Sequence, residues 1–175
     1  MRTVFAISLL ALSIAAVGCK KAVVIDHPAF PGTADGAKAL LAEFVKPGSN
    51  VGTLTKNLRA EPGDYAAVFT GDAAKKVQTV MDTAWGNGQF LIKPMHPNQT
   101  EMIVLKATTD ELKAGSPNCP GGYKDAAAQM APGITVYCFK FVEPGSKTGS
   151  AYDGLIFVNG HWAIFPKPWF ALKNP

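Results

Sequence analysis

The sequence predicts an α+β fold in which helices come first and an antiparallel sheet follows. Three observations support this class. Apolar residues recur with a helical period in the first half of the chain and with β-type runs in the second half. Near the C-terminus, Asn159-Gly160 separates two β-rich runs and predicts a tight hairpin. Helices that precede strands, rather than alternate with them, are typical of α+β domains.

The first strong helix is predicted at residues 35–46. One of its faces is apolar, because successive members are spaced by about three or four residues. The members of this face are Ala37, Leu40, Leu41, Phe44 and Val45. Asp35 is expected to cap the start of the helix, and Pro47-Gly48 is expected to end it.

A second strong helix is predicted at residues 72–85, after a shorter helical piece at residues 64–69. Asp72 is its expected cap, and Gly86-Asn87-Gly88 is its expected end. Its buried stripe is expected to contain Ala73, Ala74, Val77, Val80, Met81, Ala84 and Trp85.

The second half of the chain is predicted to form mainly strands. Residues 100–107 and 133–145 are rich in β-formers, with a short helix expected at residues 123–130 between them. Both faces of the 133–145 segment are mostly apolar, which predicts a strand in the centre of the sheet. The hairpin at Asn159-Gly160 then completes the sheet.

The first residues of the chain follow the pattern of an export signal. Arg2 precedes an uncharged run from Val4 to Val17, which corresponds to the basic start and apolar centre of a signal peptide. This run is too short to cross a bilayer, since a spanning helix needs about 20 apolar residues. Residues 1–18 are therefore expected to be a signal peptide.

The end of this run resembles the lipobox of bacterial lipoproteins, in which an aliphatic residue and two small residues precede a cysteine. The matching residues are Ala16, Val17, Gly18 and Cys19. The resemblance implies that Cys19 carries a diacylglycerol, becomes the acylated N-terminus and attaches the protein to the membrane. Lys20 stands where Asp would imply retention at the inner membrane, so the resemblance implies the periplasmic face of the outer membrane. The alternative is an ordinary secretory signal that is cleaved near Gly18 and leaves Cys19 as a thiol.

The rest of the chain is expected to comprise a lipidated tether at residues 19–34 and a single globular domain at residues 35–175. The tether contains prolines and a glycine but no hydrophobic period. The remaining length suits one domain. Although the formal net charge is +4, the lysines are dispersed and form no basic stripe. A nucleic-acid partner is therefore not predicted.

The lipobox resemblance leaves Cys119 and Cys138 as an even remainder. In an oxidising compartment, such a pair is expected to form a disulfide. A redox pair is one alternative, but catalytic dithiols usually have the spacing Cys-x-x-Cys. A metal site is another alternative, but His27, His96 and His161 occur singly, without a second ligand nearby in the sequence. We therefore predict no metal and no cofactor.

The order of helices and strands is similar to that of NTF2-like (cystatin-like, SnoaL-type) domains. The segment "DGLIFVNGHWAIF" also resembles their final hairpin, in which Gly-x-Trp follows the turn. The resemblance implies helices packed on a curved sheet that encloses a pocket. Some members, such as ketosteroid isomerases, are enzymes that need a carboxylate base and an oxyanion-binding Tyr or protonated Asp. Side chains of these types here are Tyr65, Tyr137, Tyr152, Asp64 and Asp153, and their spacing selects no pair.

Large aromatic side chains provide a candidate pocket or contact surface. The residues assigned to it are Tyr65, Trp85, Tyr137, Trp162, Phe165 and Trp169. The alternative is that these rings fill the edge of the core. Pro166 and Pro168 are expected to end the last strand and to hold the following Trp169 in an extended segment.

Three functions remain open from the sequence. The first is a lipid-anchored envelope protein that binds a small molecule or a protein, or has a structural role, without catalysis. The second is an NTF2-like enzyme of the isomerase or hydrolase type. The third is an assembly or folding factor that uses an exposed sheet edge or the aromatic terminus. A pocket with a buried carboxylate of raised pKa favours the enzyme, whereas an exposed apolar patch favours binding.

Overall fold

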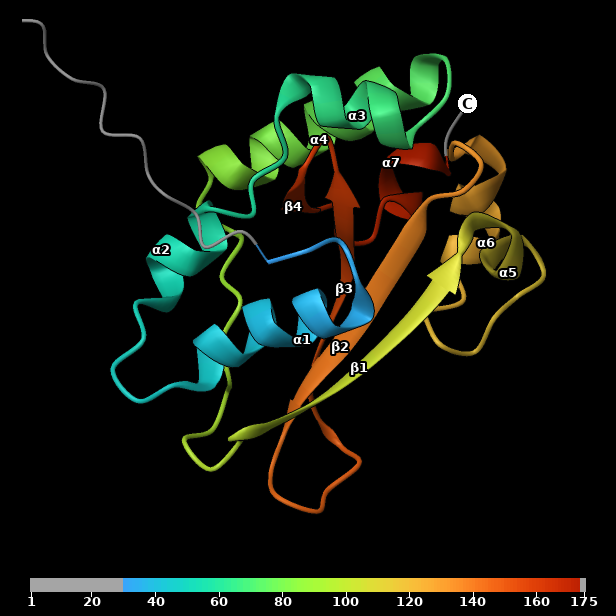
Figure 1. Cartoon of the computed structure of the whole chain (residues 1–175). Helices are drawn as coiled ribbons and strands as arrows, with labels where there is room; N and C mark the ends of the chain where they lie inside the picture. The colour runs from blue at the N-terminus through green and yellow to red at the C-terminus, as the bar shows by residue number, and fades with distance from the viewer. Residues whose placement is uncertain (1–29, 174–175) are drawn as a thin grey trace, which may run out of the picture.

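The computed structural model describes residues 30–173. This part of the chain confirms the predicted α+β class (Figure 1). Its strands are β1 (Glu101–Thr108), β2 (Thr135–Val142), β3 (Gly149–Val158) and β4 (His161–Ile164). Its α-helices are α1 (Ala34–Ala42), α2 (Val51–Lys56), α3 (Pro62–Val68), α4 (Asp72–Gly86), α5 (Thr109–Lys113), α6 (Tyr123–Ala126) and α7 (Trp169–Leu172). Short 3₁₀ turns, η1 (Glu43–Val45) and η2 (Ala127–Gln129), extend α1 and α6.

The four strands form an antiparallel meander in the order β1-β2-β3-β4. The central position predicted for the 133–145 segment is confirmed, because β2 has β1 on one side and β3 on the other. The predicted hairpin joins β3 to β4. Asn159 and Gly160 have φ angles of +50° and +84°, which is the left-handed pair that a type I′ turn requires.

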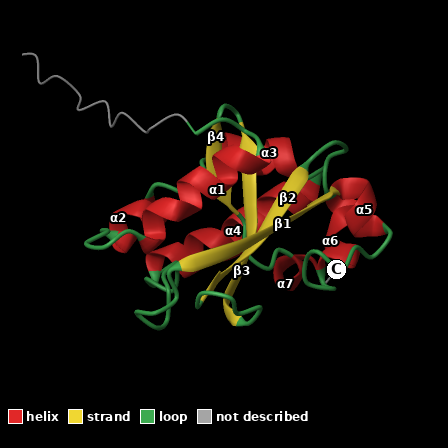
Figure 2. Ribbon diagram, turned by 60° about the horizontal axis from the view of Figure 1, so that its bottom comes forward, coloured by secondary structure: helices red, strands yellow, loops and turns green. Residues whose placement is uncertain are grey.

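The sheet buries apolar side chains on both of its faces. On one face, Phe139 and Phe141 pack in a cluster with Leu41 of α1, and Figure 1 shows α1 lying across the sheet. On the other face, Val136 and Ile156 pack in a cluster that includes residues of α3, α4, α6 and α7. Figure 2 shows α5 and α6 at one end of the molecule and α2 at the other.

The two strong helices lie where they were predicted, but their starts differ, and only Ala73, Val77 and Met81 of the stripe expected at residues 72–85 are buried. Thr33 caps α1 instead of Asp35, because its side-chain oxygen accepts the backbone N–H of Gly36 at 3.1 Å. Asp72 is the first residue of α4 rather than its cap. Val80, which we expected to be buried, is 43% exposed. It lies at the margin of the apolar stripe and lines a groove.

Three short helices were not predicted. The helices α2, α5 and α7 have six, five and four residues, which is too short for a helical period to appear in the sequence. Trp169 begins α7 and is therefore not in the extended segment that we expected. Pro168 causes no conflict there, since a proline is tolerated at the first turn of a helix. No helix within residues 30–173 combines the length and apolar character needed to span a membrane.

Candidate functional site

A β-bulge sets the position of Asp153. The register of β2 and β3 shifts so that Asp153 and Gly154 lie opposite the single residue Cys138. Gly154 has a φ of +85°, and a Cβ atom there would lie 2.2 Å from the carbonyl oxygen of Phe165. Only glycine fits this position without strain. Bulges redirect side chains and occur often beside functional sites.

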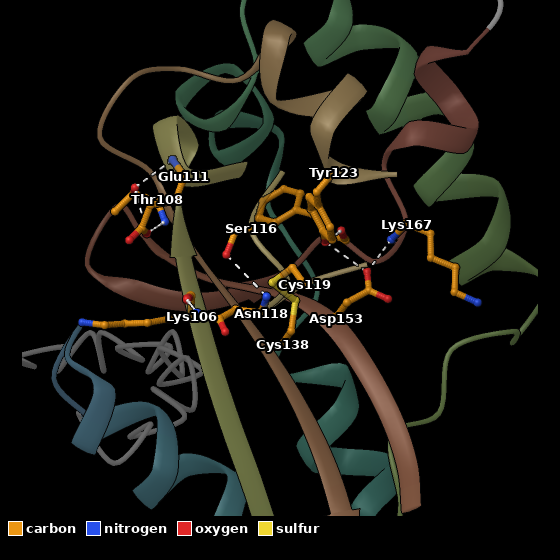
Figure 3. The surroundings of a disulfide bond; sticks show 11 residues. Lys106, Thr108, Glu111, Ser116, Asn118, Cys119, Tyr123, Cys138, Asp153 and Lys167 are labelled. Carbon is orange, nitrogen blue, oxygen red and sulfur yellow. Dashed lines mark hydrogen bonds between the residues drawn. A yellow bond between two sulfur atoms is a disulfide. The ribbon is translucent and has the colours of Figure 1, made fainter. Parts of the chain in front are cut away.

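The carboxylate of Asp153 uses only one of its two oxygens for the fold. Oδ1 accepts the Tyr123 hydroxyl at 3.0 Å and the backbone N–H of Lys167 at 2.8 Å (Figure 3). Oδ2 receives no hydrogen bond from any residue of the described range, and Figure 3 shows it turned away from Tyr123. The enclosed polar side-chain atoms without a partner in this range are Tyr65 Oη and Trp85 Nε1. The unpaired Oδ2 atom is therefore not enclosed.

Burial controls the protonation of this pair. Asp153 is 6% exposed, and desolvation raises the pKa of its carboxyl group. The hydrogen bonds from Lys167 and Tyr123, and the charge of Lys167, oppose this rise. Burial, and then the neighbouring Asp153, raises the pKa of Tyr123 well above its usual value. The phenol of Tyr123 consequently stays protonated and acts as a donor.

Asp153 lines an apolar groove with a volume of about 410 Å³. We name it the Asp153 groove, and its main residues are Val80, Leu91, Asp153, Pro166, Lys167 and Phe170. Val80, Leu91 and Phe170 are 43%, 45% and 64% exposed. In the part of the chain that the structure describes, only Met95 and Leu105 are other large apolar side chains with comparable exposure. Three of the five exposed large apolar side chains in this part of the chain therefore line one groove.

The predicted disulfide between Cys119 and Cys138 is present, with the two Cα atoms 5.6 Å apart. It supports both ends of the Tyr123–Asp153 hydrogen bond. Cys138 lies opposite the bulge that contains Asp153, and Cys119 precedes Tyr123 by one turn of chain. Figure 3 shows the two sulfur atoms next to this hydrogen bond. The disulfide thus links the strand opposite Asp153 to the segment that carries Tyr123.

A second buried carboxylate, Asp64, lies in the first turn of α3 and is 1% exposed. Its Oδ1 accepts Nδ2 of Asn159 at 2.8 Å. Its Oδ2 accepts the backbone N–H of Glu61 at 2.7 Å and Nε2 of His161 at 3.0 Å. Both oxygens of Asp64 are therefore occupied. The arrangement joins the start of α3 to the β3–β4 turn, and it has a complete structural explanation.

A second groove of about 470 Å³ lies beside this carboxylate. Its lining includes Leu54, Leu58, His161 and Trp162, and we name it the Trp162 groove. Trp162 itself is buried, and its indole N–H donates to the carbonyl oxygen of Phe30 at 3.1 Å. This groove contains one of the aromatic residues that the sequence selected.

The structure distributes the predicted aromatic residues over several places. Tyr65 and Phe165 pack edge to face in the core, with ring centroids 5.3 Å apart. Tyr137 packs on Trp162 at 5.3 Å. The other two lie elsewhere: Trp169 packs on Tyr123, and Trp85 lies below the guanidinium group of Arg59. Only Trp162 lines either of the two named grooves.

The tyrosines considered as catalytic groups also have separate environments. Burial raises the pKa of Tyr65 to about 12, and its hydroxyl is enclosed. Tyr152 donates its hydroxyl to the carbonyl oxygen of Lys93 at 2.7 Å, which attaches the segment before β1 to the sheet. Tyr137 is buried, and this burial raises its pKa. Of these candidate carboxylates and phenols, Asp153 is the one that both lines the Asp153 groove and has an oxygen without a hydrogen-bond partner in the described range.

Several residues of the Asp153 groove were missed by sequence reasoning. Val80, Leu91 and Phe170 come from α4, from the segment before β1 and from α7. No sequence spacing relates these three segments. The one available signal was Val80, which extends the apolar stripe of α4 beyond the width that the core covers.

Two further predictions concern residues that carry ligands or lipids. Within the described part of the chain, no group of three or more His, Cys, Asp or Glu side chains is placed to hold a metal ion. Cys19 and the lipobox lie outside the described residues.

Comparison of the chain with protein-family models, with curated proteins and with solved structures found no match.

Proposed function

We propose that this protein is a lipid-anchored envelope protein whose α+β domain binds an apolar ligand in the Asp153 groove, without catalysing a reaction. The observation that carries this proposal is the convergence of Val80, Leu91 and Phe170 on one groove. Exposed apolar surface is unfavourable in water, at about 25 cal/mol per Å². A ligand that covers these three side chains removes that surface from water, and this provides the binding energy.

The dimensions of the groove favour a small molecule over a protein. Its volume of about 410 Å³ lies in the range of roughly 300–1,000 Å³ that small-molecule sites have. A stable protein partner usually covers about 800 Å² on each side. The polar lining is sparse, with Asp153 and Lys167 as the formally charged residues of the groove, as expected for a site that accepts an apolar body.

Binding to the Asp153 groove can be tested with the neutral fluorescent dye N-phenyl-1-naphthylamine. The full chain with Cys19→Ser is suitable, since no lipid or detergent then competes for the dye. We expect saturable binding, and we expect Phe170→Ser to weaken it about tenfold, because a buried Phe contributes roughly 1.5–3 kcal/mol.

A matched control for this test is Leu105→Ser. Leu105 is a similarly exposed apolar residue, but it lies on β1 and does not line the groove. Its variant should bind the dye as the unsubstituted chain does. If the unsubstituted chain does not bind the dye, or if both substitutions weaken binding equally, the groove is not the site.

The anchor is supported by the resemblance of Ala16 to Cys19 to a lipobox. Lipid attachment through two or more acyl chains would hold the protein stably at a membrane. We expect Cys19→Ser to move the protein from the membrane fraction to the soluble fraction, as measured by sedimentation of the envelope. Continued sedimentation of the variant with membranes would contradict the lipid assignment.

An enzyme of the isomerase or hydrolase type is a second candidate, because Asp153 is a buried carboxyl group of raised pKa in a groove. Its ability to act as a general acid or base depends on that pKa. Hydrolysis of p-nitrophenyl butyrate should then occur with the unsubstituted chain and be lost in Asp153→Asn. A rate equal to the buffer background in both proteins leaves binding as the function.

The outer edge of β1 gives less support to an assembly factor. A strand-adding partner needs free backbone groups along an edge. At one end of β1 these groups are already occupied (Figure 3). Asn118 donates to the carbonyl oxygen of Lys106 at 2.9 Å, and the N–H of Thr108 donates to Glu111 at 2.7 Å.

A further inference from the structure

We infer that the ligand of the Asp153 groove carries an ammonium group on its apolar body, and that Oδ2 of Asp153 accepts a hydrogen bond from this group. The inference rests on the proposed binding function and adds the chemistry of the polar end of the ligand. An apolar amine is thus the expected class of ligand.

The first argument is the unequal use of the two carboxylate oxygens. Oδ1 already accepts from Tyr123 and Lys167, whereas Oδ2 has no partner among residues 30–173. Asp153 as a residue is more than nine-tenths buried, but its Oδ2 atom is not among the enclosed polar atoms, so this acceptor remains open to a donor from outside the fold. A ligand that covers this oxygen without offering a donor would leave it unpaired, which is costly, so Asp153 selects ligands with an N–H or O–H group.

The second argument selects a charged donor over a neutral one. Hydrogen bonds between an ammonium group and a carboxylate are roughly twice as strong as those between neutral groups. The attraction is stronger at a partly desolvated carboxylate than in bulk water, and desolvation is the main cause that raises the pKa of Asp153. The charge of Lys167 acts on Asp153 from a distance and lowers its pKa, but the ion pairs found in the described range do not include Lys167 with Asp153, so no ammonium group contacts Oδ2 directly.

The third argument is that the acceptor is held in position before the ligand arrives. Two donors fix Oδ1, the bulge fixes the backbone, and the nearby disulfide supports β2 and Tyr123. A fixed acceptor loses little conformational freedom on binding. Val80, Leu91 and Phe170 line the same groove, so the apolar body of an amine has a surface next to its head group.

Three probes with the same chain length separate the head group from the apolar body. Decylammonium, 1-decanol and decanoate are each titrated, below their micelle concentrations, into the complex of the dye with the Cys19→Ser chain. We expect decylammonium to displace the dye at a concentration at least tenfold lower than decanoate, with 1-decanol between them.

Asp153→Asn is the decisive variant because it keeps the shape of the side chain. The amide oxygen can still accept from Tyr123 and Lys167, whereas the amide nitrogen places a donor where Oδ2 was. Decylammonium should bind about tenfold or more weakly to this variant, as expected for the loss of a charged hydrogen bond. Binding of the dye and of 1-decanol should remain, which also shows that the variant is folded.

Lys167→Asn should act in the opposite direction. It removes a cation that lines the groove, and asparagine tolerates the left-handed backbone at this position, where φ is +49°. We expect decylammonium to bind two- to threefold more tightly and decanoate to bind more weakly, since a solvent-exposed charge has only a small effect on a neighbouring charge.

The outcomes distinguish the two proposals. If the dye binds but the three probes displace it equally, or if Asp153→Asn leaves decylammonium unchanged, the ammonium inference is overturned and the apolar groove stands. A preference for decanoate also overturns it and indicates an anionic ligand held by Lys167. If the dye itself does not bind, the proposed function fails.

Discussion

The two buried carboxylates, Asp64 and Asp153, have similar surroundings but different remaining capacity for hydrogen bonds. Each joins segments that are far apart in the sequence, through His161 in one case and Tyr123 in the other. Each also accepts from a residue with a left-handed backbone. Asn159 has a φ of +50° and uses its side chain, whereas Lys167 has a φ of +49° and uses its backbone N–H.

The difference lies in the second oxygen. Asp64 accepts three hydrogen bonds through both oxygens, so the fold itself accounts for its burial. Asp153 accepts two hydrogen bonds through one oxygen, and it borders an apolar groove. Burial of a carboxylate alone is therefore a weak indication of function in this protein. An unpaired oxygen on a residue that lines a groove is the more informative feature.

The largest expected effect concerns the covalent support that only the Asp153 region has. Replacing Cys119 and Cys138 together by Ala should lower the free energy of unfolding by about 3 kcal/mol, because the loop that they close has roughly 20 residues. Urea denaturation measures this loss. Dye binding in the Asp153 groove should weaken as well, since Tyr123 and the bulge lose their link. An unchanged urea midpoint would show that the bond adds nothing to stability.

The second-largest effect is expected when the fully paired carboxylate of Asp64 is removed. Asp64→Ala leaves the backbone N–H of Glu61 and the side chain of Asn159 without their acceptor. It should lower the free energy of unfolding by about 2 kcal/mol, as expected when buried donors lose a partner. Dye binding in the Asp153 groove should persist below the unfolding transition. Asp64→Asn, which keeps one acceptor oxygen, is the matched control and should lose less.

Asp153→Asn is expected to change the dependence of stability on pH. The pKa of Asp153 is raised in the folded protein above the ordinary value of 3.8. As pH rises above 3.8, the unfolded chain loses this proton first, so the folded state becomes less stable until its own raised pKa is passed. The Asp153→Asn variant has no titrating carboxyl group at this position, so it does not lose stability in this way. Its stability relative to the unsubstituted chain should therefore increase with pH across that window, as measured by urea denaturation at several pH values.

A constant difference between the two proteins over the same pH range would contradict the assigned direction. Tyr123→Phe provides a control, because it removes one hydrogen bond to Oδ1 but keeps the carboxyl group. This variant should retain the decline of stability with rising pH.

The smallest effects are expected from substitutions at Lys167 and Asn159, the two residues with a left-handed backbone. Lys167→Gly relieves the backbone strain and keeps the N–H donor to Asp153. It should change stability by less than about 1 kcal/mol, in the stabilising direction. Asn159→Gly relieves similar strain but removes the side-chain donor to Asp64, so it should destabilise by about 0.5–1 kcal/mol. Thermal unfolding of both variants checks the signs, and two shifts of the same sign would contradict the comparison.

Much of the fold was predictable from local patterns. The period of Leu40, Leu41 and Phe44 predicts α1, and Asn159-Gly160 predicts the final hairpin. These signals depend on residues a few positions apart, so a linear sequence contains them. The pairing of Cys119 with Cys138 was predictable for a different reason, since the lipobox resemblance assigned the third cysteine elsewhere.

The candidate site was only partly predictable. Asp153 was among the carboxylates selected by residue type, but its partner Tyr123 was not, because 30 residues separate them. Val80, Leu91 and Phe170 meet through the packing of α4, α7 and the segment before β1. Nothing in their local sequences requires that meeting.

The sequence by itself thus determined the fold class, the positions of the longer helices and strands, and the export and cysteine patterns from which an envelope location is expected. The tertiary structure alone decided which apolar side chains stay exposed and which carboxylate oxygen remains unpaired. The physical reason is that secondary structure follows from short-range periodicity. By contrast, a groove is the space left between elements, and it depends on how all of them pack together.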